Sequence, residues 1–359
     1  MQTAIVIPCL NEESLITATA ASLGFGLGPT CTPPATSLIL VDNGSEDKTP
    51  SILRHIREES RANSVIVVAE RERGYVPARH RGMLAVRALV DAERFPHDEV
   101  LILQADADTL YEEGYVEAMR AVALAAPPNA LIEGITRPPT RFLHDYPGYQ
   151  LLANEIDESI ASLFADDQSD VIVDDKVSGF SLKSYFAWGA HRREYTPWGA
   201  ELHAETARLF IRGKIRGATK ARAGDAVAAP SRRRLIENPV KHFASAGFPR
   251  EESWWPAWSA AYAGPVDLFA FEDVGSRPAL ASAIATRKAH LIALFSILPT
   301  VLERVFRRST GPEPLHPIVQ TMADAFSPHS LAELDDTLVP LFEHLFRLVD
   351  DNTEIFADL

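Results

Sequence analysis

The sequence has few of the features that mark secreted, nucleic-acid-binding or membrane-spanning proteins. Only two of its 359 residues are cysteines, Cys9 and Cys31, which is too few for a disulfide framework and typical of a reducing compartment. Basic residues are outnumbered by acidic ones, 35 against 49, and a net charge of -14 disfavours a dedicated nucleic-acid binder. We therefore expect a cytoplasmic protein that binds no nucleic acid.

Long apolar runs are also missing. No uninterrupted apolar stretch reaches about 18 residues, and no basic segment followed by an apolar run opens the sequence, so we expect neither a transmembrane segment nor a signal peptide. One C-terminal run, HLIALFSILPTVLERVFRR (290–308), could lie on the inner face of a membrane as an interfacial helix. Packing against the rest of the chain, or a homodimer interface, is the preferred interpretation of that run.

Apolar, β-branched runs alternate with helix-forming segments through the first 135 residues. Strands are expected at residues 4–8, 37–41, 65–69, 100–103 and 130–135. Helices are expected near 77–92 and 112–126, and Asn11 or Ser14 is expected to cap an earlier helix. Strands and helices at this spacing form βαβ units with right-handed crossovers, which predicts an α/β fold with a mostly parallel sheet and flanking helices.

The pattern is looser after residue 140. A helix is expected at 151–164 and a short strand at 171–173. Basic residues of the segment 214–234 are separated by Gly, Ala and Ser, so we interpret it as a flexible, solvated loop, with a phosphate-contacting flap as the alternative. From residue 278 onward, Ala- and Leu-rich segments predict a C-terminal helical appendage, broken at Pro299 and at later prolines.

Two aspartates, Asp106 and Asp108, come directly after the apolar run 100–103. Ligands of open α/β sheets bind at the carboxyl ends of the strands, so these carboxylates are well placed for chemistry. An Asp-x-Asp pair there can hold a hard divalent cation such as Mg²⁺ or Mn²⁺, which can neutralise a diphosphate. The same pattern is common in turns, where aspartate accepts hydrogen bonds from nearby backbone N–H groups.

Four expected strand ends carry polar motifs in a fixed order. They read VIPCLNEE (6–13), LVDNGSEDKT (40–49), GYVPARHRG (74–82) and ADADT (105–109). Together they resemble the nucleotide-sugar half of the GT-A fold, and most closely the family 2 glycosyltransferases. The resemblance covers residues 1–135, which would bind the nucleotide sugar. It implies an acceptor-binding and catalytic half at 136–265, followed by the C-terminal helical region at 266–359.

This resemblance implies a metal-dependent glycosyltransferase of glycan or glycoconjugate biosynthesis. The donor would be a nucleotide-diphosphate sugar, with a UDP-sugar favoured, and the acceptor a hydroxyl of a sugar, a lipid-linked molecule or a small molecule, with inversion. The donor nucleoside would be bound by Pro8, Asn11, Glu12, Asp42 and Asn43, with Asp42 at the nucleobase.

The resemblance also assigns the diphosphate and the metal. Arg79 would lie near the diphosphate, an anion that a guanidinium group suits. Asp106 would contact both the donor and the Mg²⁺ or Mn²⁺ ion, and Asp108 would coordinate the ion directly. His203 is the candidate for a third metal ligand.

Members of the family place their general base in a downstream Glu-Asp motif at the start of a helix. The base takes the proton of the acceptor hydroxyl as that hydroxyl attacks the sugar. In this chain the motif corresponds to Glu205 and Thr206, so a threonine stands where an aspartate is common. Glu205 is therefore the candidate base and Glu201 the reserve. His80 is a second departure, because the family usually has asparagine there.

Two alternatives of other classes remain. A catalytically inactive binding protein would retain the GT-A fold; Thr206 favours this alternative, and the intact Asp-x-Asp pair speaks against it. A sugar-phosphate nucleotidyltransferase would carry a Gly-rich loop with Arg and Lys directly after the first strand. This chain has PCLNEES at that position, which disfavours the second alternative.

Overall fold

The computed structural model describes residues 1–95, 100–166, 169–197, 199, 201–202, 204–246, 267–307, 316–326 and 330–357. These residues belong to two units, each with its own core. The first comprises Met1–Pro138, Val173–Arg193 and Glu205–Ser231, and the second comprises Pro139–Ile172, Glu194–Ala204 and Arg232–Leu359. The sequence analysis divided the chain by function into three consecutive regions, whereas these two units are defined by packing. The functional division stays a prediction.

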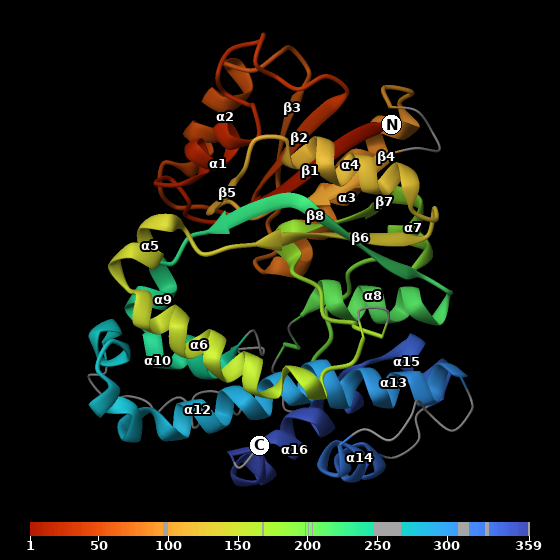
Figure 1. Ribbon diagram of the computed structural model, residues 1–359. Helices are drawn as coiled ribbons and strands as arrows, with labels where there is room; N and C mark the ends of the chain where they lie inside the picture. The colour runs from red at the N-terminus through yellow and green to blue at the C-terminus, as the bar shows by residue number, and fades with distance from the viewer. Residues whose placement is uncertain are drawn as a thin grey trace. The chain divides into compact units, whose positions relative to one another are not determined.

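The apolar runs of the first unit form one sheet of eight strands among the described residues (Figure 1). Their bounds are β1 (Gln2–Cys9), β2 (Thr36–Asp42), β3 (Val65–Ala69), β4 (Val100–Gln104), β5 (Thr109–Tyr111), β6 (Ala130–Thr136), β7 (Ser178–Ser181) and β8 (Thr219–Pro230). The strand order is β3-β2-β1-β4-β7-β6-β8-β5. Pairing is parallel from β3 to β4 and between β6 and β8, and antiparallel at the other contacts. All five strands expected within the first 135 residues are present.

Helices cover both faces of this sheet. They are α1 (Ile16–Ser22), α2 (Thr49–Glu58), α3 (Tyr75–Asp91), α4 (Tyr115–Ala125), α7 (Leu182–Ala187) and α8 (Glu205–Ile215), with the 3₁₀ turn η2 (Asp175–Val177). Side chains alternate along β1, so Ile5 and Ile7 pack in the core of α1, α2 and α4. Ala4 and Val6 pack in the opposite core, which contains α3, α7 and α8. Burial on both faces explains why the strands are continuous apolar runs.

The second unit is helical in its described part. It contains α5 (Thr140–Asp145), α6 (Pro147–Ile160), η1 (Ala161–Leu163), α9 (Arg233–Glu237), α10 (Pro239–Ser245), η3 (Leu268–Phe271), η4 (Val274–Ser276), α12 (Arg277–Ile292), η5 (Ala293–Ile297), α13 (Leu298–Arg307), α14 (Pro317–Asp324), α15 (Leu331–Asp336) and α16 (Val339–Ala357). The expected C-terminal helices are thus present. Aromatic rings dominate one of its cores, where Tyr149 contacts Phe142, Phe243 and Phe271.

The segment 214–234, expected to be a loop, is mostly strand β8. Lys220 and Arg222 made it resemble a solvated segment, but both pair with Glu133 of the neighbouring strand β6. The Lys220 ammonium lies 2.9 Å from the Glu133 carboxylate, and their side chains are only 1% and 4% exposed. Further along β8, the small residues Ala223, Ala226 and Ala228 face the core. The loop prediction was therefore wrong, because the charges are neutralised by a strand that is distant in sequence.

Two smaller predictions were also wrong. Neither Asn11 nor Ser14 caps α1, which begins after Leu15 without a side-chain cap. The Asn11 side chain instead accepts a hydrogen bond from the backbone N–H of Glu46 at 2.8 Å, and so connects two loops. Residues 171–173 form no strand, and the strand nearest to them is β7.

Pro299 does not break its helix, contrary to expectation. The five residues Ala293–Ile297 form a π-helical turn, after which α13 continues. Because proline lacks an N–H group and crowds the preceding turn, a widened turn before Pro299 accommodates it. The continuous stretch Arg277–Phe306 has the length and composition of a membrane-crossing helix, but 72% of its most apolar window is buried, as in a core helix. This finding is weak evidence for a membrane span.

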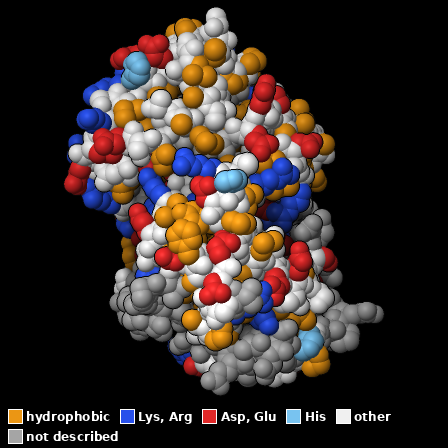
Figure 2. Space-filling view, turned by 60° about the vertical axis from the view of Figure 1, so that its left-hand side comes forward, with side chains coloured by type: hydrophobic (Ala, Val, Ile, Leu, Met, Phe, Trp, Pro, Cys, Tyr) orange, Lys and Arg blue, Asp and Glu red, His pale blue; other side chains and the backbone are white. Residues whose placement is uncertain are grey.

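Charged side chains of both signs lie interspersed on the face of the molecule shown in Figure 2. Such mixing is typical of an ordinary protein surface rather than of an extended single-sign field.

A buried histidine of α12 makes the stability of the second unit depend on pH. His290 is 1% exposed, and its Nδ1 lies 2.9 Å from the carbonyl oxygen of Ala244 in α10, to which it donates as a neutral ring. Burial lowers the pKa of His290 from 6.5 to about 3. Because a depressed histidine pKa favours protonation of the unfolded chain, stability is lost as the pH falls from 6.5 towards 3.

We predict that His290→Asn, which retains a donor at this position but cannot titrate, loses less stability on acidification than the wild-type chain. The difference should be roughly 2–3 kcal/mol between pH 7 and pH 4.5, at about 1.4 kcal/mol per pH unit. Urea unfolding at both pH values measures it. The exposed His55 of α2 supplies the control His55→Asn, which should follow the wild type; equal losses in all three proteins would contradict the prediction.

Candidate active site

A buried arginine connects three carboxylates at the carboxyl end of the parallel strands. The Nη2 of Arg79 donates to Oδ1 of Asp106 at 2.8 Å and lies 3.7 Å from Oδ2 of Asp175. Its Nε donates to Oε1 of Glu205 at 3.1 Å. The four residues come from α3, the end of β4, η2 and the start of α8. We call this group the Arg79 cluster.

The position of Arg79 follows from a close approach of α3 to β1. A Cβ atom at Gly82, one turn after Arg79, would lie 2.2 Å from Cγ1 of Val6. Only glycine allows this contact, and the approach leaves the Arg79 side chain only 3% exposed at the strand ends. The last glycine of the GYVPARHRG motif is therefore required by the close packing of α3 against β1.

The electrostatics of the Arg79 cluster keep the arginine charged. Burial alone would lower the pKa of Arg79, but the carboxylates of Asp175, Asp106 and Glu205 outweigh that effect and raise it. Although 24% of the Asp175 side chain is exposed, its carboxyl group is closely surrounded by protein. This loss of hydration, together with the negative charge of Glu205, raises the pKa of Asp175. With all groups ionised the cluster has two excess negative charges, which suits a cationic ligand.

The Asp-x-Asp residues have donor atoms that suit a hard divalent cation. Asp106 is 30% exposed, and its side chain accepts a hydrogen bond only from Arg79 among the described residues. Asp108 is half-buried, and its backbone carbonyl accepts from the N–H of Ser231 at 2.9 Å. Carboxylate oxygens are the ligands preferred by Mg²⁺ and accepted by Mn²⁺.

A complete protein cage for a metal is not found among the described residues, which contain no group of three His, Cys, Asp or Glu side chains that could hold an ion. The two aspartates therefore fit an ion whose remaining ligands are diphosphate oxygens and water, as is common for Mg²⁺. His203, the candidate third ligand, lies outside the described residues and stays a prediction.

The candidate donor-binding residues occupy the ends of β1 and β2. Pro8 is near the end of β1, and the backbone N–H of the buried Glu12 donates to Thr49 Oγ1 at 2.8 Å. Asp42 ends β2, and its Oδ1 accepts from the N–H of Ser45 at 3.0 Å. These residues thus lie at one sheet edge, and their roles in donor binding stay predictions.

The side chains of Asn43 and Asn11 make hydrogen bonds that hold the loops after β1 and β2 in place. The amide of Asn43 accepts from the N–H of Gly74 at 2.9 Å and donates to the carbonyls of Glu70 and Glu72 at 3.2 and 2.7 Å. It thereby fixes the loop that leads into α3 and Arg79. Asn43 is buried, and its observed contacts are with the loop backbone. A direct contact between Asn43 and the donor stays a prediction.

Thr206, at the position where the family often has aspartate, is bonded to Gln104 and His191 and also to the side chain of Asp175. It is fully buried, and its hydroxyl accepts from Gln104 Nε2 at 3.0 Å and lies 3.2 Å from His191 Nε2. Gln104 also donates to Ser178 Oγ at 2.8 Å. Burial and the nearby charge of Arg79 lower the pKa of His191, so this ring is neutral at pH 7. The network supports the start of α8, where Glu205 is placed.

Asp175 was not identified from the sequence. It follows the apolar run 171–173 within the pair Asp174-Asp175, which is the same sequence of apolar residues and then carboxylates that marked Asp106. Attention to that repetition could have found it. Asp174 accepts from the Lys176 ammonium at 2.7 Å, so only Asp175 of the pair joins the Arg79 cluster.

The two remaining candidates have other surroundings. Glu201 belongs to the second unit, where it forms a β-bridge with Tyr195. Its role as reserve base stays a prediction. His80 Nδ1 lies 2.8 Å from the hydroxyl of Tyr185, and burial lowers its pKa, which indicates a neutral packing role.

Comparison with known proteins identifies the family. The sequence profile of glycosyl transferase family 2 matches residues 4–184, just over half of the 359 residues. The chain belongs to glycosyl transferase family 2. Membership in this family confirms the expected GT-A fold and the expected enzyme class, a glycosyltransferase that uses a nucleotide sugar. No curated protein matches the sequence.

Solved structures of similar fold are distant from this family 2 glycosyltransferase. The mannosyltransferase PcManGT from Pyrobaculum calidifontis, solved with GDP-Man and Mn²⁺, is 16% identical over 96% of this chain and 87% of its own, with a TM-score of 0.46. TarS 1–349 from S. aureus is 13% identical over 85% and 86%, with a TM-score of 0.42. Glucosyl-3-phosphoglycerate synthase from Mycobacterium tuberculosis is 18% identical over 66% and 74%, with a TM-score of 0.38.

The Arg79 cluster makes a prediction about stability. In metal-free buffer, Arg79→Met should lower the free energy of unfolding by about 3 kcal/mol at pH 8, because it leaves three carboxylates without their cation. The loss should be smaller at pH 5, where these carboxylates can take up protons. Guanidinium unfolding at both pH values measures the difference.

Arg120 of α4 supplies the matched control. Its guanidinium donates to the hydroxyls of Thr3 and Thr36, which do not titrate. Arg120→Met should therefore lower the free energy of unfolding by the same amount at pH 5 and pH 8. A pH-independent loss in Arg79→Met as well would show that the carboxylates do not depend on Arg79.

Proposed function

We propose that the protein transfers a sugar from a nucleotide-diphosphate sugar to an acceptor hydroxyl, with a divalent metal and with inversion. The observation that carries this proposal is the Arg79 cluster, because a single arginine contacts Asp106 of the Asp-x-Asp pair and Glu205 of the base motif. The metal-binding and proton-accepting residues of one reaction are thereby held within reach of each other.

Glu205 is the proposed general base. Its carboxylate takes the proton of the acceptor hydroxyl while that oxygen forms a bond to the anomeric carbon. The bond from that carbon to the diphosphate breaks on the opposite face, and the nucleoside diphosphate leaves with the electron pair. The hydrogen bond from Arg79 to Glu205 orients the carboxylate before the acceptor arrives.

Arg79, Asp106 and Asp108 are proposed to serve the leaving diphosphate. The Nη1 of Arg79 is buried and has no hydrogen-bond partner among the described residues, so a donor for an anion is available there. Asp106 and Asp108 would hold Mg²⁺ or Mn²⁺, which when bound supplies Lewis acidity towards the departing charge. Pro8, Asn11, Glu12, Asp42 and Asn43 line the edge proposed for the nucleoside, with a UDP-sugar as the favoured donor.

The acceptor is proposed to be a sugar, a lipid-linked molecule or a small molecule with a free hydroxyl. Asp175 is proposed as a positioning residue, since it shares the Arg79 guanidinium with Glu205 and limits the orientations of that group. Reactions of this class build glycans and glycoconjugates.

We predict that Glu205→Gln abolishes transfer and leaves donor binding intact. Glutamine retains an oxygen that can accept from Arg79 but cannot take up the proton, so the rate should fall by roughly 10²–10⁴. Release of nucleoside diphosphate measures it, with UDP-, GDP-, CDP- and dTDP-sugars as donors and with simple sugars or water as acceptors. Glu201→Gln should keep its activity; full activity in Glu205→Gln would transfer the role of base to another residue.

Metal dependence makes a separate prediction. Chelation with EDTA should abolish nucleoside diphosphate release, and addition of Mn²⁺ or Mg²⁺ should restore it. Asp108→Asn should reduce the rate at least a hundredfold at saturating metal, because a ligand of the ion is lost. Asp91→Asn, at an exposed carboxylate of α3, is the matched control and should retain activity. Release that resists EDTA and survives Asp108→Asn would exclude the metal.

A further inference from the structure

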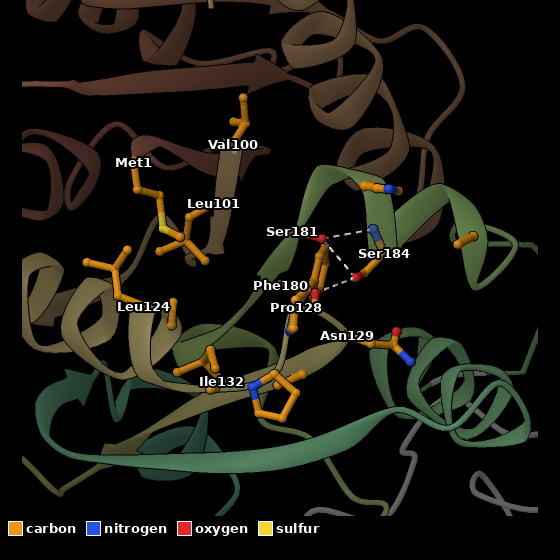
Figure 3. Close-up of a pocket in the computed structure, with 16 residues that line it drawn as sticks. Met1, Val100, Leu101, Leu124, Pro128, Asn129, Ile132, Phe180, Ser181 and Ser184 are labelled. Atoms are coloured by element: carbon orange, nitrogen blue, oxygen red, sulfur yellow. Dashed lines mark hydrogen bonds between the residues drawn. The ribbon is translucent and has the colours of Figure 1, made fainter. Parts of the chain in front are cut away.

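A pocket of about 540 Å³ lies at the end of the sheet where β4 begins (Figure 3). Val100 and Leu101 of β4 line it, whereas the Arg79 cluster lies beyond the other end of the same strand. At a rise of about 3.3 Å per residue, the two sites are roughly 20 Å apart. The pocket is therefore a site separate from the proposed active site.

The volume and the lining of this pocket suit a small apolar ligand. Ligand sites of proteins commonly measure about 300–1,000 Å³ and are lined mostly by apolar side chains. Twelve of the sixteen lining residues are apolar. At its rim Leu124 is 63% exposed and Met1 is 37% exposed, and exposed apolar surface of this kind often marks a binding site.

The polar side chains of the pocket are already bonded, with one exception. Ser181 donates to Ser184, which in turn donates to the carbonyl of Pro128, as the dashed lines of Figure 3 show. Asn129 accepts from the Trp188 indole at 2.8 Å. Lys183 is exposed and makes no hydrogen bond or ion pair within the described residues. The lining thus offers the ammonium group of Lys183 beside an apolar hollow.

We propose that this pocket binds a small amphiphilic anion, with an apolar body against Met1, Leu124 and Pro127 and an anionic head at Lys183. A medium-chain carboxylate is the simplest ligand of this class. Burial of its chain supplies most of the affinity, and the ammonium group selects an anion over a neutral analogue.

The short strand β7 connects this pocket to the proposed active site. Phe180 and Ser181 line the pocket, while Ser178 at the other end of the strand bonds Gln104, which bonds Thr206 beside Glu205. β7 is paired with β4 on one side and with β6 on the other. A ligand pressed against the Ser181 end would strain this strand between its two neighbours and loosen the bond between Ser178 and Gln104. This coupling, unlike the binding, rests on the proposed function.

Binding is tested with a fluorescent fatty-acid analogue, 11-(dansylamino)undecanoate, displaced by decanoate. Saturable binding is expected in the wild type. The affinity for the probe should be at least tenfold weaker in Leu124→Asp and at least threefold weaker in Lys183→Gln. Two matched controls lie outside the pocket. They are Leu27→Asp, at a leucine that is 55% exposed, and Arg54→Gln, at an exposed cation of α2. Both should bind like the wild type, and thermal unfolding should show that all four variants are folded.

Absence of saturable binding, or equal affinity in the pocket variants and their controls, would overturn the proposed site. The coupling has its own readout. Decanoate should lower kcat for nucleoside diphosphate release at least twofold in the wild type and leave Leu124→Asp unaffected. Binding without an effect on kcat would overturn the coupling and keep the site. A protein that binds the probe but releases no nucleoside diphosphate would contradict the proposed transferase reaction instead.

Discussion

The contact on which the proposed site depends is the burial of one guanidinium group among three carboxylates. A buried arginine is costly unless it is paired, so Arg79 requires Asp106, Asp175 and Glu205 around it. Those three residues follow β4, form part of η2 and begin α8, so the pairing fixes three elements at one sheet edge. Fold stability and site geometry are consequently coupled, and substitutions in the cluster should affect both.

The surroundings of Glu205 show how the chain accommodates a threonine in its base motif. Thr206 is bonded to Gln104 and His191 and also to the carboxyl group of Asp175, so it links this network to the Arg79 cluster. Asp175 supplies a third carboxyl group next to Arg79, from a different element.

Sequence patterns predicted the parallel half of the sheet well, because β1 to β4 are continuous apolar runs ended by polar residues. The Asp-x-Asp pattern singled out Asp106, and the family resemblance singled out Arg79 and Glu205; the structure brings these three side chains together. The strand β8 could not be predicted, since the charges of Lys220 and Arg222 are cancelled by Glu133, a residue of β6 that is distant in sequence. The missing cap of α1 has a similar cause, because the Asn11 side chain bonds a neighbouring loop instead. Such long-range contacts determine the local structure where the intrinsic propensity of the segment does not.

In the proposed site, Asp106, Asp108 and Arg79 bind a metal-bound diphosphate. Calorimetric titration of the protein with UDP, GDP, CDP and dTDP, each with and without Mn²⁺, tests it most directly, since it needs no acceptor. We predict saturable binding of one diphosphate that requires Mn²⁺ and is lost in Asp108→Ala. Absence of binding for all four in the presence of Mn²⁺, or equal binding without the metal, would contradict the claim.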